Sequence, residues 1–209
     1  MQYSNLYFCQ IPYYEFYDGT ENADVPECMN FLPVDIVGED HETHELLFGA
    51  LTSKKTLPQK ICARCTENDG VISDATVVFC AKAENGALVT VGWYSHANVT
   101  AVPELLPLSD EDGSEIMHPF FFCTYKKNAV LLPPEERFQP KWQIPRGKST
   151  VKGNNRQTVK FGFSSDTLWL CDEPLSAAQA WKQTFYETIL DYSQNGDNML
   201  DDTETKENE

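Results

Sequence analysis

The stretch Thr76–Thr100, TVVFCAKAENGALVTVGWYSHANVT, decides the fold. It predicts two β-strands, residues 76–83 and 87–93, joined by a turn at Glu84-Asn85-Gly86. Asn-Gly is a preferred centre of a tight hairpin turn because both residues tolerate the positive φ that the strand twist requires. We therefore expect a β-hairpin at the centre of this protein.

Hydrophobic patterns on either side of this hairpin predict the remaining elements. Further strands are expected in the β-prone runs at residues 3–11, 118–125, 129–132, 159–163 and 167–171. Pro103 and Pro107 are expected to break regular structure. A capping box at residues 176–179 precedes an apolar stripe at helical spacing, which predicts a helix over 176–192. The stripe consists of Trp181, Phe185, Ile189 and Tyr192.

These elements predict one α+β domain over residues 1–193. We expect a strongly curved, mainly antiparallel sheet or a partly open β-barrel, with the C-terminal helix packed on it. Residues 194–209 are acidic and poor in apolar side chains, so a disordered tail is expected there. A chain of 209 residues can bury one sizeable core.

Cysteine usage and the N-terminus predict the compartment. The seven cysteines are an odd number, and most of them lie in apolar runs, as in a reducing compartment. No apolar run is long enough to cross a bilayer, and the N-terminus lacks the basic start of a signal peptide. We expect a cytoplasmic protein that does not enter a membrane.

Charge is distributed unevenly along this chain of net charge −16. Residues 18–45 hold nine acids and no Lys or Arg, and are interpreted as mostly solvated loop. Nine of the sixteen basic residues lie between Lys126 and Lys160. Such a basic stretch favours nucleic acid as a partner, although the same cations could instead pair with the protein's own acids.

Aromatic and basic residues together suggest a ligand site. Trp93 and Tyr94 end a predicted strand, where large rings with polar tips could stack on a planar ligand. His96, Asn98 and Trp142 could complete this ligand-binding set. Phosphates would be held by Arg137, Arg146, Lys148, Lys152 and Arg156.

A metal site and a catalytic site are weighed in the same way. His41 and His44, followed by Cys62 and Cys65, have a spacing that suits tetrahedral zinc. Loop histidines and packing cysteines are the alternative interpretation. No local triad or paired-carboxylate motif is present, so we assign no catalytic residue and no cofactor.

A set of collinear motifs over about residues 6–192 resembles a bacterial module found alone or joined to nuclease and other defence-type domains. These motifs are Phe8-Cys9, Asn30-Phe31-Leu32-Pro33, Val91-Gly92-Trp93-Tyr94 with Ala97 and Val99, Leu131-Leu132-Pro133, Glu136-Arg137, Ile144-Pro145-Arg146 and Trp169. The resemblance implies a reader module similar to the small PUA/EVE-like barrels that bind modified bases. The family pattern after Gly-Trp-Tyr is Lys-Asn-Ala-Thr-Val-Tyr-Arg, whereas this chain has SHANVTA at residues 95–101.

Two functions follow as hypotheses. The first is non-catalytic recognition of a nucleotide or modified base in nucleic acid, through the aromatic set and its basic rim. The alternative is an acidic interaction protein of regulatory or anti-defence type, whose negative face docks a basic partner or imitates the charge of DNA. The acids expected to carry that face are Asp35, Glu39, Asp40, Glu42 and Glu45.

Overall fold

The computed structural model describes residues 5–21, 26–51, 64–109, 115–145, 147–150, 158–161, 168–169 and 176–201. Between residues 147 and 179 it describes the backbone alone. The chain packs as two compact units. We call residues 1–10, 78–93 and 130–209 the helical unit, and residues 11–77 and 94–129 the acidic unit. Strands β4 and β5 contribute residues to both units. That residues 1–193 form one domain stays a prediction.

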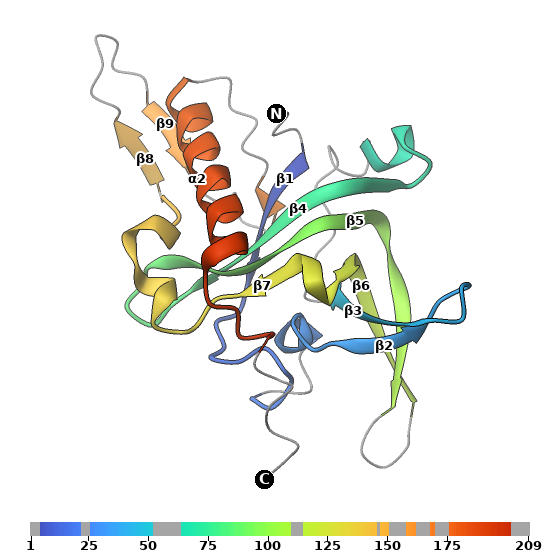
Figure 1. The fold of residues 1–209 in the computed structure, drawn as a ribbon. Helices are drawn as coiled ribbons and strands as arrows, with labels where there is room; N and C mark the ends of the chain where they lie inside the picture. The colour runs from blue at the N-terminus through green and yellow to red at the C-terminus, as the bar shows by residue number, and fades with distance from the viewer. Residues whose placement is uncertain are drawn as a thin grey trace. The chain divides into compact units, whose positions relative to one another are not determined.

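The fold is α+β, as predicted (Figure 1). Its strands are β1 (Leu6–Ile11), β2 (Val34–Val37), β3 (Thr43–Gly49), β4 (Val71–Lys82), β5 (Leu88–Ser109), β6 (Glu115–Tyr125), β7 (Ala129–Leu131), β8 (Gly147–Thr150), β9 (Thr158–Phe161) and β10 (Leu168–Trp169). The long helix is α2 (Ser176–Asn195), and the 3-10 turns are η2 (Pro26–Met29), η3 (Lys126–Asn128), η4 (Glu136–Phe138) and η5 (Pro140–Trp142).

The main sheet has eight strands, in the order β10-β1-β4-β5-β6-β3-β2, with β7 paired to β5. Strands β8 and β9 pair separately. Every pair whose register the structure gives is antiparallel. In the described residues the order ends at β10 on one side and at β2 on the other, so the sheet is open.

Helix α2 covers the core of the helical unit. Phe185, Ile189 and Tyr192 of the predicted stripe are buried. The ring of Trp181 stacks on that of Phe185, with the ring centroids 5.2 Å apart. They pack with residues of β1, β4, β5 and β7 in one apolar cluster, which includes Phe8. The helical period in the sequence therefore predicted both the helix and its buried face.

The segment after α2 corrects the predicted start of the tail at residue 194. Met199 donates its backbone N–H to the carbonyl of Leu131 at 3.0 Å, and Asn198 Oδ1 accepts the N–H of Leu131 at the same distance. Leu200 is only 4% exposed. These contacts, among others, hold the chain in place as far as Asp201, and residues 202–209 lie outside the described residues.

Two predictions about the acidic unit are wrong. Strand β5 continues past residue 100 to Ser109, because Pro103 lies where the register with β6 shifts between Val99 and Glu104, and bulges accommodate proline. Much of the segment expected to be loop instead forms a hairpin of β2 and β3. That hairpin exists because β3 also pairs with β6, a strand about seventy residues further along the chain.

The central hairpin was predicted correctly, but the backbone conformation of its turn differs from the predicted one. Ala83 donates its N–H to the carbonyl of Ala87, and Gly86 donates to the carbonyl of Ala83, both at 2.9 Å. The loop is therefore three residues long, and within it only Gly86 has positive φ, at +83°. Asn85 does not need positive φ in such a turn, whose left-handed residue is the last of the three.

Candidate functional site

The rings predicted to stack on a ligand in the helical unit are buried. Trp93 and Trp142 are both 0% exposed, with ring centroids 5.3 Å apart. Trp93 Nε1 donates to Ser193 Oγ of α2 at 3.1 Å. Helix α2 and its C-terminal turn thus occupy the space that a planar ligand would need, so the ligand-binding role predicted for these two residues is corrected.

Tyr94 is buried by a different part of the chain. It follows Trp93 in β5 and therefore points to the opposite face of the strand. It is 0% exposed, its hydroxyl donates to the carbonyl of Asn30, and its ring meets Phe31 edge-on at 5.5 Å. Its predicted ligand contact is also corrected, because its ring and hydroxyl are buried against Asn30 and Phe31 within the acidic unit.

The polar members of the predicted set are exposed. His96 Nδ1 lies 2.6 Å from Asp74 Oδ1, and both side chains are at least 70% exposed. His96 and Asp74 both have positive φ, at +52° and +57°. Asn98 is exposed as well. His96 and Asn98 are therefore available to a ligand, but the rings expected beside them are not.

The predicted phosphate-binding set divides into one buried residue and several that the structure does not describe. Arg137 is 0% exposed, and its Nε donates to the carbonyl of Leu132 at 2.9 Å, which corrects its predicted contact with phosphate. Arg146, Lys152 and Arg156 lie outside the described residues, and Lys148 is described by its backbone in β8 alone. The antiparallel register places Lys148 opposite Lys160.

The predicted zinc ligands do not assemble among the residues that the structure describes. Cys65 is buried, and its thiol donates to the carbonyl of Val99 at 3.5 Å. His41 is exposed, His44 lies beside Asp40, and Cys62 lies outside the described residues. The one group of potential metal ligands in the described chain contains no cysteine and consists of Asp40, Glu42 and His44.

A concentration of exposed acidic charge lies on the hairpin of β2 and β3. We call residues 34–49 the acidic hairpin. It contains no Lys or Arg, and all five of its carboxylates are exposed: Asp35, Glu39, Asp40, Glu42 and Glu45. These are the acids that the alternative hypothesis named. The whole acidic unit holds 18 acidic and six basic residues, so it carries −12 of the net charge of −16.

Register brings two of these acids together. Asp35 lies directly opposite Glu45 in the β2–β3 ladder. Like charges in direct cross-strand positions destabilise a hairpin. Lys126 Nζ approaches Glu45 Oε1 at 2.9 Å and offsets one charge, whereas Asp35 has no ion pair with any described residue. This arrangement thus costs stability locally.

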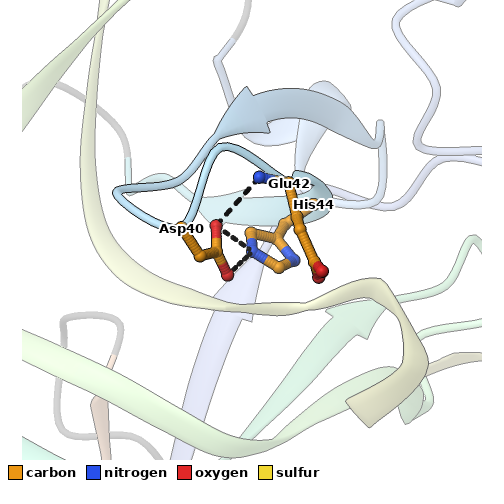
Figure 2. A group of neighbouring side chains, drawn as sticks. All are labelled: Asp40, Glu42 and His44. Carbon is orange, nitrogen blue, oxygen red and sulfur yellow. Dashed lines mark hydrogen bonds and ion pairs between the residues drawn. The ribbon is translucent and has the colours of Figure 1, made fainter.

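The turn of the acidic hairpin holds a second group of polar side chains (Figure 2). Asp40 accepts hydrogen bonds from the backbone N–H of Glu42 at 3.0 Å and from His44 Nε2 at 3.0 Å. The Glu42 N–H first, and His44 second, hold the pKa of Asp40 below its usual value. The ligand atoms of Asp40, Glu42 and His44 lie within 4.8 Å of one another and could hold a divalent cation, but here Asp40 and His44 pair with each other.

Backbone geometry at this turn repeats that of the central hairpin. Gly38 donates its N–H to the carbonyl of Glu42 at 2.9 Å, and His41 donates to the carbonyl of Gly38 at 3.0 Å. His41 occupies the left-handed position, with φ at +63°, where the other hairpin has glycine. A Cβ at Gly38 would lie 2.6 Å from Asp40 Oδ1 and 3.1 Å from His44 Nε2, so a larger residue there would displace these two side chains.

Comparisons with family models, with curated proteins and with solved structures find no match. The resemblance to the bacterial reader module therefore stays an expectation. Among the described residues, no helix is both long enough and apolar enough to cross a membrane. The acidic hairpin is the candidate functional site that the structure itself offers.

Proposed function

We propose that this protein is a non-catalytic interaction module whose acidic hairpin docks a basic segment of a partner protein. The observation that carries the proposal is the exposure of five carboxylates on a hairpin of sixteen residues without a single Lys or Arg. Solubility alone does not need acids in direct register, as Asp35 and Glu45 are, because that pairing works against the fold. A cationic partner would relieve the repulsion between these two carboxylates, which would favour binding.

Recognition of a base has less support from the described residues. The three rings that would stack on it are buried, and Arg137 is buried too. Binding of nucleic acid stays a prediction that residues 146–160 would have to carry, because side chains are not described there. The net charge of −12 on the acidic unit favours a cationic partner instead.

A binding experiment with a defined probe tests the proposal. The probe is a fluorescently labelled peptide, Lys-Thr-Lys-Thr-Val-Thr-Lys-Thr-Lys, blocked at both ends. Binding is measured by fluorescence anisotropy across a series of salt concentrations. The test variant replaces each hairpin acid with its amide: Asp35→Asn, Glu39→Gln, Asp40→Asn, Glu42→Gln and Glu45→Gln. Each exposed ion pair contributes about 0.2–1 kcal/mol, so losing several should weaken binding by roughly tenfold or more.

A matched control separates the position of the acids from the total charge of the protein. It carries five amide substitutions at exposed acids of the helical unit, and so reaches the same net charge. These acids are Glu84, Glu135, Glu187, Asp191 and Asp201. We expect the control to bind the probe within about threefold of the native chain, because it keeps all five carboxylates of the acidic hairpin. Equal losses in both variants would refute docking at the hairpin.

A further inference from the structure

We propose that the basic segment binds by strand addition: it pairs as an extended strand with the outer edge of β2. This inference rests on the proposed function and specifies the conformation of the partner. Strand β2 stands at the end of the sheet order and, in the described chain, pairs with β3 alone (Figure 1). An edge strand presents a row of backbone donors and acceptors that another chain can use.

The hydrogen-bond pattern of the hairpin identifies which groups face outward. Gly38 and Glu42 form a hydrogen-bonded pair next to the turn. Hydrogen-bonded and non-bonded pairs alternate along an antiparallel ladder. The pairs Ile36–His44 and Val34–Leu46 are therefore bonded, and the N–H and C=O groups of Asp35 and Val37 point away from β3.

Side chains at this edge are accessible. Asp35 is exposed, and Val37 is 68% exposed, so another chain can contact both side chains. Strand β2 reads VDIV, without the proline or lysine that commonly protects an edge. Its one charge, Asp35, would repel a second acidic edge, so the edge disfavours another copy of this chain and favours a cationic strand.

Cross-strand pairing then defines the side chains of the partner. Asp35 and Val37 are two residues apart and therefore share one face of β2. The added strand should present Lys or Arg opposite Asp35 and an apolar residue opposite Val37, because such pairs stabilise neighbouring strands. The partner motif is thus a cation and an apolar residue separated by one residue. We infer an antiparallel orientation, in which the residues opposite Asp35 and Val37 direct their own N–H and C=O groups toward β2. The probe peptide has the motif on both sides of its valine, so an antiparallel strand presents it correctly.

N-methylated peptides test strand addition without altering the protein. In one peptide the valine and its two nearest lysines are methylated on their backbone nitrogens, which would face β2. In its matched partner three threonines are methylated, whose nitrogens would face away. We expect the first peptide to bind at least tenfold more weakly than the unmodified probe, and the second to bind within about threefold.

Protein variants and amide exchange supply an independent readout. Val37→Pro removes one outward N–H and leaves the β2–β3 ladder its donors, so it should weaken binding about tenfold, whereas Val37→Ala should change it less than threefold. In the native chain, binding should slow hydrogen exchange at the amides of Asp35 and Val37, but not at Ile36, which β3 already protects. If Val37→Pro does not fold, the two peptides still decide the question.

The outcomes separate the two proposals. Equal affinities of the two methylated peptides would overturn strand addition, and docking at the hairpin would stand if the five-acid variant still loses binding. Equal losses in the five-acid variant and its matched control, or no binding of the probe by the native chain, would overturn both. A loss of binding confined to the peptide methylated at lysine and valine would support both docking at the hairpin and strand addition.

Discussion

Replacing Trp93 and Trp142 one at a time by phenylalanine tests whether these rings belong to the core. Both side chains are 0% exposed and lie in the same apolar cluster. Each substitution removes the same atoms, so the packing losses should be similar. What differs is the indole N–H: Trp93 Nε1 donates to Ser193 Oγ at 3.1 Å, whereas Trp142 Nε1 is buried with no acceptor among the described residues.

The expected difference follows from these two nitrogens. Trp93→Phe loses a hydrogen bond worth about 0.5–1.5 kcal/mol. Trp142→Phe removes a buried donor that has no acceptor in the described part of the chain, which returns about 1–3 kcal/mol. The free energy of unfolding should therefore fall further in Trp93→Phe than in Trp142→Phe, by roughly 1.5–4.5 kcal/mol.

Urea unfolding followed by far-UV circular dichroism measures this difference, because that signal does not depend on the tryptophans that are replaced. Ser193→Ala removes the acceptor alone and should reproduce the hydrogen-bond part of the Trp93→Phe loss. Equal destabilisation by the two tryptophan substitutions, or a larger loss for Trp142→Phe, would refute the reasoning. Rings on an open stacking surface would instead change the free energy of unfolding by no more than about 0.5 kcal/mol.

Three further predictions concern the turn, the buried guanidinium and pH. His41→Gly should raise the free energy of unfolding by about 0.5–1 kcal/mol, because glycine adopts the left-handed conformation without strain, and the reciprocal Gly86→His should lower it by a similar amount; urea titration of both variants checks this. Arg137→Ala should lower the free energy of unfolding by roughly 2–4 kcal/mol through lost packing and an unpaired carbonyl, whereas an arginine that only held phosphate would leave it unchanged. The carboxyl of Asp40 should titrate with a pKa below that of an ordinary aspartate in an NMR pH series. Since the folded pKa of Asp40 is lowered, its contribution to stability is present above the unfolded pKa and is lost as the pH falls through the folded pKa. His44→Gln should raise the folded pKa of Asp40 only in part, because the stronger contact is the backbone N–H of Glu42.

Local pattern was sufficient to predict most elements of this fold. The apolar period of residues 181–192 identified α2, and the runs around Asn85-Gly86 identified the central hairpin, because such signals depend on neighbours a few residues away. Strands β2 and β3 were missed for the opposite reason. Their acids resemble those of a solvated loop, and only pairing with β6 makes them a hairpin.

Sequence alone determined the composition of the chain, its α+β class and the five acids of the alternative hypothesis. Tertiary structure decided which residues are accessible. Trp93 has the same chemical character on a surface as in a core, and its burial depends on α2, which places Ser193 against it one hundred residues later. The same holds in part for Arg137, because its guanidinium contacts Met199, 62 residues later, in addition to the nearby carbonyl of Leu132. Exposure is a property of what packs over a side chain, and that information does not lie in the residues beside it.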